Sequence, residues 1–163
     1  MIRKKNKFSW PRKLYDKNRI AAENKLLEQY GLKSKREIWK AEAKVKYFRN
    51  RAKFLITADA EDQNKFFAKL YSFGLPVKNI ADVLALNKED LLQRRLSTIV
   101  WKKQFANTAK QARQMIVHRK VSVGGKIVDV PSFIVPIDQE ATIFAKKTAI
   151  VKNDKQTLKE DAE

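Results

Sequence analysis

The chain has 163 residues, which is enough for one ordinary domain or two small ones. It carries 36 lysine and arginine residues against 18 aspartate and glutamate residues, for a net charge of +18, and it has no cysteine. Disulfides, zinc–thiolate sites and iron–sulfur clusters are thereby excluded. No apolar run approaches the roughly 20 residues of a membrane span. The basic start, MIRKKNKFSWPRK, has no apolar core and is not expected to be a secretory signal.

Positive charge is concentrated in two blocks of the chain. Residues 1–58 have a net charge of +13 and residues 94–137 one of +8, whereas residues 59–93 carry −2 and residues 138–163 carry −1. Such blocks repel each other unless a polyanion neutralises them, and solubility does not require so large an excess. No segment has the pattern of an isolated membrane-surface helix. We therefore expect a nucleic acid, and no membrane, as the partner.

The first part of the chain is expected to be an arm followed by a helix. Residues 1–15 mix basic and aromatic side chains without a regular period, which predicts an extended basic arm. A first helix is expected over residues 16–30 and should end at Gly31. Ser34 and Glu37 have the spacing of a capping box, which predicts the start of a second helix.

The second predicted helix is long and has one apolar stripe. Its apolar residues recur at steps of three and four, at Ile38, Ala41, Val45, Phe48, Ala52 and Leu55. We expect this stripe to face the core. The flanks carry candidate phosphate contacts, of which we single out Lys40, Lys44, Arg49 and Arg51.

The nearly neutral segment that follows is also predicted to be helical. The acids of residues 59–62 mark a helix start, and the helix should end at Gly74. Its aromatic-rich face is expected to be core rather than a base-stacking platform, because the local charge is low; it comprises Phe66, Phe67, Leu70, Tyr71 and Phe73. A short helix over residues 77–84 and an N-cap at Asn87 complete a helical domain placed at residues 16–90.

Residues 91–145 are predicted to form a small module that begins with two helices. In the first helix, Leu92, Leu96, Ile99 and Val100 form the apolar face, and another face carries Arg95, Thr98 and Lys102. Thr108 and Gln111 have the spacing of a second capping box. The helix after it should turn Ala109, Ala112 and Ile116 inward and expose Lys110, Arg113 and Gln114.

A hairpin is predicted directly after these helices. Gly124 and Gly125 lie between two valine-rich and isoleucine-rich runs, which indicates a primed two-residue turn. Residues 133–135 are expected to form another strand. After Asp138 the chain is polar and unpatterned, and the tail over residues 146–163 is predicted to be disordered.

Signatures of catalysis are missing. Gly124-Gly125-Lys126 resembles the end of a phosphate-binding loop, but the upstream glycine is missing and Ile127 stands where Ser or Thr is needed. His118 is the only histidine and has no plausible local partner for catalysis. We expect no enzyme activity, no metal site, no cofactor and no small-molecule substrate.

What the module does contain is a basic surface. Only one acid, Asp129, interrupts residues 94–137, and this imbalance favours phosphate binding. The candidate RNA contacts in the module are Arg94, Arg95, Lys102, Thr108, Lys110, Gln111, Arg113, Gln114, His118, Arg119, Lys120 and Lys126. His118 is equally well explained as a solvated residue before a strand.

The stretch RRLSTIVWKKQFANTAKQARQMIVHRKVSVGGKIVDVPSFIVP resembles the S4 RNA-binding domain, which takes its name from a small-subunit ribosomal protein. The residues that carry the resemblance include Arg95-Leu96, Thr108, Ala112-Arg113-Gln114, Ile116, Val121, Val123 and Pro131-Ser132-Phe133. Upstream, YGLKSKREIWK is similar to a stretch typical of the archaeal and eukaryotic ribosomal proteins of this family. The family often has Asn-Gly at the turn where this chain has Gly-Gly. Cysteine zinc ligands, present in some bacterial members, are impossible here.

The resemblance implies an α+β fold in which a helical N-terminal region precedes a helix–helix–hairpin module and a polar tail. It implies a cytoplasmic, ribosome-bound protein that joins the small subunit early, at a multi-helix junction in the 5′ part of the rRNA. Neighbouring small-subunit proteins, mRNA where it enters the subunit, and an influence on decoding accuracy are implied as well. Two alternatives stay open: a free-standing S4-domain protein of the ribosome-rescue or heat-shock type, and a DNA-binding helix-turn-helix protein.

Overall fold

The structure is a computed structural model that describes residues 6–146. Part of the predicted arm, residues 1–5, and nearly all of the predicted disordered tail, residues 147–163, lie outside the described residues. The helices are α1 (Lys17–Gln29), α2 (Lys35–Leu55), α3 (Ala60–Ser72), α4 (Ile80–Ala85), α5 (Lys88–Gln93), α6 (Leu96–Lys102), α7 (Ala109–Val117) and α8 (Ile137–Glu140). The strands are β1 (Val121–Val123), β2 (Lys126–Ile127) and β3 (Ile143–Ala145).

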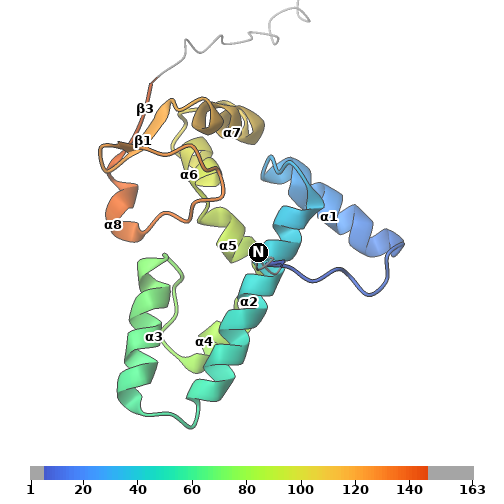
Figure 1. The fold of residues 1–163 in the computed structure, drawn as a ribbon, viewed down its shortest axis with the longest axis vertical. Coiled ribbons are helices and arrows are strands. Elements are labelled where there is room, and N and C mark those ends of the chain that lie inside the picture. Colours follow the sequence, from blue (N-terminus) through green and yellow to red (C-terminus); the bar gives the residue numbers. More distant parts are fainter. Residues whose placement is uncertain (1–5, 147–163) are drawn as a thin grey trace, which may run out of the picture.

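The helices and the small sheet occupy different parts of the molecule (Figure 1). Helices α2 and α3 form a long hairpin, α4 and α5 return along α2, and α1 packs beside the first half of α2. Beyond α5, the helices α6 and α7 pack against each other and the sheet lies next to them. The short helix α8 contacts α3 and so links the sheet region to the α2–α3 hairpin. The predicted α+β class is confirmed.

The sheet is antiparallel with strand order β2-β1-β3. Gly124 and Gly125 join β1 to β2 with φ angles of 56° and 77°, the positive values that a primed hairpin turn requires. The predicted hairpin is therefore confirmed. Val121 and Val123 point into a core that they share with α6 and α7, whereas Ser122 pairs with Ile127 and Phe144 on the opposite face.

Three apolar clusters make up the core. One lies under the sheet and is built around Leu96, Val100, Ile116 and Val135. The second fills the space between α2, α3, α4 and α5, around Phe48, Leu70 and Val83. The third joins the end of α1 to the start of α2, through Leu26, Tyr30, Leu32 and Ile38, together with Leu92.

Most helix predictions agree with the structure. Asp16 caps α1 by accepting hydrogen bonds from the backbone of Asn18 and Arg19, and Gly31 follows the helix with a φ of 58°. In the predicted stripe of α2, all residues are buried except Ala41, which is partly buried. The three residues predicted to face inward from α7 are also buried.

The strand predicted at residues 133–135 is wrong. Only an isolated bridge between Arg95 and Ile134 forms there. The third strand is β3, in the segment whose sequence looked unpatterned; it pairs with β1 from Val121 opposite Ala145 to Val123 opposite Ile143. Pro131 and Pro136 flank the failed strand, and proline cannot donate a ladder hydrogen bond.

Three further details differ from prediction. The helix expected to run on from Leu91 breaks at Arg94 and Arg95, which separate α5 from α6. The short helix expected from residue 77 begins only at Ile80, where Asn79 and Asp82 form a capping box. Tyr71, predicted to lie in the core, is 64% exposed.

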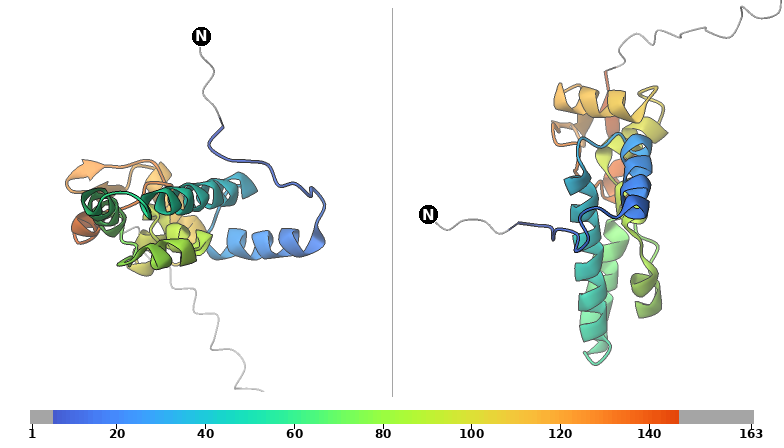
Figure 2. Two further views of the ribbon diagram at one scale, coloured as in Figure 1. Left: turned by 90° about the horizontal axis from the view of Figure 1, so that it is seen from below. Right: turned by 90° about the vertical axis from the view of Figure 1, so that its right-hand side faces the viewer.

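Residues 6–15 have no helix or strand, but they are not detached from the fold (Figure 2). The rings of Phe8 and Trp10 lie 5.9 and 5.3 Å from the ring of Trp39 on α2. The indole of Trp39 donates a hydrogen bond of 2.9 Å to Glu23, which is buried on α1. The arm and α1 are thus both anchored on the first turns of α2.

Candidate nucleic-acid interface

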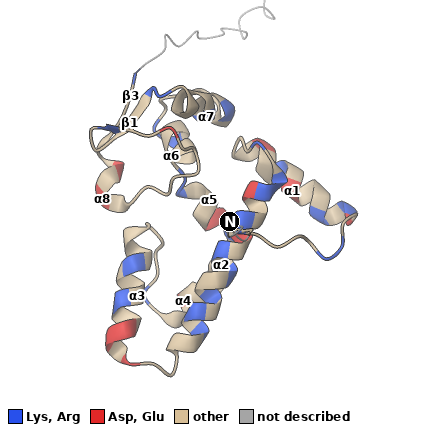
Figure 3. Ribbon diagram, viewed as in Figure 1, with Lys and Arg blue, Asp and Glu red and all other residues tan. Residues whose placement is uncertain are grey.

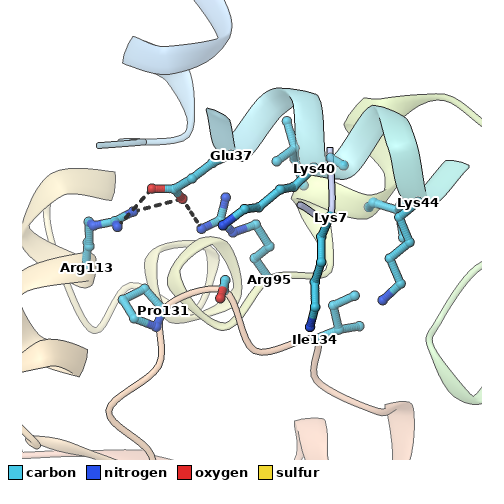
Figure 4. Close-up of a pocket in the computed structure, with 12 residues that line it drawn as sticks. Lys7, Glu37, Lys40, Lys44, Arg95, Arg113, Pro131 and Ile134 are labelled. Atoms are coloured by element: carbon cyan, nitrogen blue, oxygen red, sulfur yellow. Dashed lines mark hydrogen bonds and ion pairs between the residues drawn. The ribbon is translucent and has the colours of Figure 1, made fainter. Parts of the chain in front are cut away.

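A largely buried ion triad connects α2 to the module (Figure 4). Both guanidinium nitrogens of Arg113 on α7 donate to the Glu37 carboxylate, at 3.1 and 3.0 Å. Arg95, at the break between α5 and α6, donates to the same carboxylate. The Arg95 side chain is only 7% exposed and that of Glu37 16%. Bidentate arginine–carboxylate pairs of this kind fix orientation as well as adding energy.

This triad explains why the predicted capping box at Ser34 is wrong. The Ser34 side chain makes no cap hydrogen bond. Glu37 accepts a weak bond from the backbone of Lys33, at 3.3 Å, and otherwise faces the two arginines. The two arginines carry a full positive charge, and Arg113 binds in a bidentate manner, which a backbone N–H group cannot match, so the arginines outcompete the helix terminus for the carboxylate.

The electrostatics of Glu37 follow from its two partners. Burial by itself raises the pKa of Glu37, but hydrogen bonds from Arg113 and Arg95, together with their charges, outweigh it and hold the pKa below its ordinary value. Glu37 is therefore ionised at neutral pH. The prediction that Arg95 and Arg113 lie on an exposed polar face is wrong, because both side chains neutralise this carboxylate.

Arg94 is also engaged within the protein. Its guanidinium donates to Glu140 at 2.9 Å and to the backbone carbonyls of Phe73 and Val135 at 3.2 and 3.0 Å. It thereby joins the end of α3, the segment before α8, and α8 itself. For Arg94, Arg95 and Arg113, RNA contact stays a prediction, and their contacts within the protein already account for them.

Between α2 and the module lies an open cleft of about 450 Å³. Lys7 from the arm and Lys40 and Lys44 from α2 line it, opposite Pro131 and Ser132 of the loop before α8. Figure 4 shows these lysine side chains on the same side of the triad. Among the described residues that line the cleft, Glu37 alone has a carboxylate, and the arginines offset its charge. The cleft is therefore suited to an anion.

Lys40 and Lys44 differ in their surroundings. Lys40 is exposed, whereas the amine of Lys44 lies 5.1 Å from the Phe73 ring and 5.8 Å from the Phe48 ring. Burial, with a smaller contribution from the charge of Lys69, lowers the pKa of Lys44. An approaching phosphate would favour the charged form of Lys44, because an opposite charge stabilises the ammonium.

The other predicted cations of α2 lie farther along the helix. Arg49 donates a hydrogen bond of 2.6 Å to the backbone carbonyl of Leu86, so it holds the loop between α4 and α5. Arg51 is exposed, and its guanidinium lies 5.6 Å from the ring of Phe54.

Helix α7 presents an exposed ridge to solvent. Lys110, Gln114 and His118 follow one another at steps of four residues and are all exposed, so they lie on the same face. Thr108 caps the helix by accepting from the backbone of Gln111, and the Gln111 side chain accepts from the backbone of Asn107 rather than from Thr108. The predicted capping box is thus only half formed.

The cations around the hairpin are exposed. These are Arg119, Lys120 and Lys126. Arg119 has a φ of 57°, the left-handed value that ends α7, and its side chain lies 3.6 Å from Asp129 in a pair exposed on both sides. Exposed pairs contribute little, so Arg119 is available to a stronger anion. Lys102, on α6, is exposed and donates to Gln93 at 3.3 Å.

The structure thus divides the predicted site residues into two groups. Thr108, Gln111, Arg49 and the three arginines of residues 94–113 make contacts within the protein. The exposed cations belong to the hairpin, α7, α6 and α2. Sequence reasoning missed Lys7 as a cleft residue; its place in a basic arm was visible, but the folding of that arm onto α2 was not.

Two classes of site find no support within residues 6–146. No cluster of histidine, aspartate and glutamate side chains in this range could hold a metal ion. No helix in the same range is long and apolar enough to cross a membrane.

Residues 94–140 match the model of a protein family described as S4 domain. Most of the chain is similar to proteins named small ribosomal subunit protein uS4. It is 41% identical over 159 residues to those of Saccharolobus islandicus (strain L.S.2.15) and Saccharolobus solfataricus, covering 92% of this chain and 88% of each relative. It is 43% identical over 132 residues to that of Methanococcus aeolicus, covering 77% of this chain and 75% of the relative.

Proposed function

Because this chain belongs to the uS4 family of small ribosomal subunit proteins, we propose that it is a structural constituent of the small ribosomal subunit and binds rRNA. Its place is then on ribosomes in the cytoplasm, and its role is architectural rather than enzymatic. The family match covers α1 to α5 as well as the S4 domain. A free-standing S4-domain protein would not need those helices, and neither would a DNA-binding helix-turn-helix protein.

One observation carries the proposal: the ion triad joins the two basic blocks of the chain in one structure. Lys7, Lys40 and Lys44 line the cleft beside the triad, and α7, which supplies Arg113 to the triad, carries the exposed ridge of Lys110, Gln114 and His118. The triad connects the two parts through largely buried side chains. RNA helices are recognised mainly through shape and phosphate position, which requires cations held at fixed distances from one another.

The finer features are also part of this proposal. A junction of several rRNA helices would match a surface with two basic parts, since each part could follow a different helix. Early binding during assembly, contacts with neighbouring proteins, proximity to incoming mRNA and an effect on decoding accuracy extend the proposal further. The family resemblance supports them, and each needs its own experiment on assembled subunits.

The test is binding of the purified chain to transcribed small-subunit rRNA at 50–200 mM KCl. With roughly six to ten phosphate contacts, affinity should fall by about 10³–10⁵ over this range. Lys110→Gln with Lys120→Gln should weaken binding. It should also reduce the slope of log affinity against log salt by about two, because two phosphate contacts are lost. A matched control is Lys65→Gln with Lys78→Gln, which removes the same charge from the nearly neutral segment. A flat salt dependence for the unmodified chain, or equal losses in both variants, would contradict the proposal.

A further inference from the structure

One face of α2 combines exposed aromatic rings with cations. Lys40, Lys44, Tyr47, Arg51 and Phe54 follow one another at steps of four and three residues. Side chains at this spacing lie on one face of a helix. We call this face the α2 stripe. It differs from the buried stripe of the same helix, which runs from Ile38 to Leu55.

The two rings of the α2 stripe are largely open to solvent. Tyr47 is 64% exposed and Phe54 is 67% exposed. The Tyr47 ring centroid lies 6.0 Å from that of Phe48, and the Arg51 guanidinium lies 5.6 Å from the Phe54 ring. Each ring therefore has a neighbour within the protein and still leaves much of its surface available to a partner. Folding of the chain does not explain their exposure.

The charge around the rings selects the class of partner. Residues 40–55 contain six lysines and arginines and a single acid, Glu42. Figure 3 shows cations along the length of α2, whereas acidic residues gather at the start of α3. Those acids, Glu61 and Asp62, are partly matched by Lys65 at 3.6 and 3.7 Å. An apolar segment of another protein would not need this excess of cations, but a polyanion with flat apolar faces would.

Nucleobases have such flat apolar faces. They stack on exposed aromatic side chains where nearby cations bind the nucleic-acid backbone. The α-carbons of Tyr47 and Phe54 are about 10.5 Å apart along the helix axis. That spacing is about three times the 3.4 Å between stacked bases in a strand. A continuous stack cannot place neighbouring bases on both rings, so the stripe suits bases that project singly from a loop or bulge.

We propose that the α2 stripe binds unpaired bases of the rRNA, which stack on Tyr47 and Phe54 while Lys40 and Arg51 contact the adjoining phosphates. This rests on the proposed function, and it adds a base-stacking contact, outside the S4 domain, to a surface otherwise defined by phosphate binding.

The experiment compares three purified full-length chains in binding to small-subunit rRNA. Tyr47→Ala with Phe54→Ala should fold normally, because both positions are exposed and alanine favours the helix. Its affinity should fall by roughly 5- to 150-fold for each base that loses its ring. The slope of affinity against salt should not change, since no phosphate contact is removed. The matched control, Tyr15→Ala with Tyr71→Ala, removes two aromatic rings that are 89% and 64% exposed elsewhere and should bind like the unmodified chain.

A second readout places the contact directly. With rRNA containing 4-thiouridine, irradiation should cross-link the peptides that contain Tyr47 or Phe54. If the unmodified chain fails to bind rRNA, the proposed function is wrong. If it binds and the Tyr47/Phe54 variant binds equally well, only the stacking contact is wrong. Normal rRNA affinity with loss of a neighbouring protein from reconstituted subunits would instead show that the stripe is a protein interface, and would overturn the proposal.

Discussion

Glu37 joins segments that are far apart in the chain, since its arginine partners follow it by 58 and 76 positions. A carboxylate this deeply placed would be costly without its partners, and each arginine would be costly without the carboxylate. Removing one member therefore leaves the others without compensation. The triad acts at the scale of single residues, but it determines how α2 lies against α7.

We expect Glu37→Gln to destabilise the protein by about 1–3 kcal/mol at pH 7, less than the loss of a fully buried pair because the partners are partly exposed. The pKa of Glu37 is lowered in the folded protein. Its stabilising effect is therefore complete above the unfolded pKa of about 4.3, and is lost as pH falls through the folded pKa. Urea unfolding at pH 7 and pH 3 measures the free energy of unfolding of the variant and of the unmodified chain. The difference between these two values should be smaller at pH 3. Glu89→Gln, at an exposed position, is the control. If Glu37→Gln lowered the free energy of unfolding by the same amount at both pH values, ionised Glu37 would not be the stabilising group.

Among the secondary-structure elements, a second close contact between the N-terminal helices and the module lies at Gly31. A Cβ atom there would lie 2.7 Å from the Ala109 carbonyl carbon and 2.8 Å from the Lys110 nitrogen. These are backbone atoms at the start of α7, which cannot easily move. Gly125 in the hairpin also has a positive φ, but a Cβ atom there would meet nothing within 4 Å.

These two glycines make a matched pair for mutation. Gly125→Ala should cost about 1 kcal/mol, from the left-handed backbone alone. Gly31→Ala has the same backbone penalty and a clash in addition, so it should cost at least about twice as much. Denaturant unfolding of both variants measures the difference. Equal losses would mean that α1 and α7 can separate without cost, and that the close approach at Gly31 does not matter for stability.

Elements whose formation depends on neighbouring residues could be predicted from the sequence, and elements that depend on distant partners could not. The stripe of α2 and the Gly124-Gly125 turn follow from spacing and φ preference, and both were predicted. Strand β3 was not predicted, because its three residues form a strand only by pairing with β1. In that pairing Phe144 lies opposite Ser122, which is 22 positions earlier in the chain. The roles of Arg95 and Arg113 were missed for the same reason. Their charge was visible in the sequence, and their common partner on α2 was not.

For the whole molecule, uncompensated charge is the main feature. In residues 6–146, ion pairs engage seven of the 29 lysine and arginine side chains of that range: Arg19, Lys35, Lys65, Arg94, Arg95, Arg113 and Arg119. A net charge of +18 favours association with a polyanion and opposes the compact fold of the free protein. Salt should therefore have opposite effects on rRNA binding and on the stability of the free chain.

We expect the melting temperature of the free protein to rise by about 3–6 °C between 10 and 150 mM KCl, as the screening length falls from about 30 to 8 Å. Lys40→Glu with Lys110→Glu lowers the net charge by four at two exposed positions. This variant should be more stable than the unmodified chain at 10 mM KCl and should gain less from added salt, because less repulsion is left to screen. Calorimetry at several KCl concentrations measures both.

Sucrose, which strengthens burial without screening charge, should stabilise the two proteins equally. A melting temperature independent of KCl would show that the cations are too far apart to repel, and the two basic blocks would then need no polyanion to lie together.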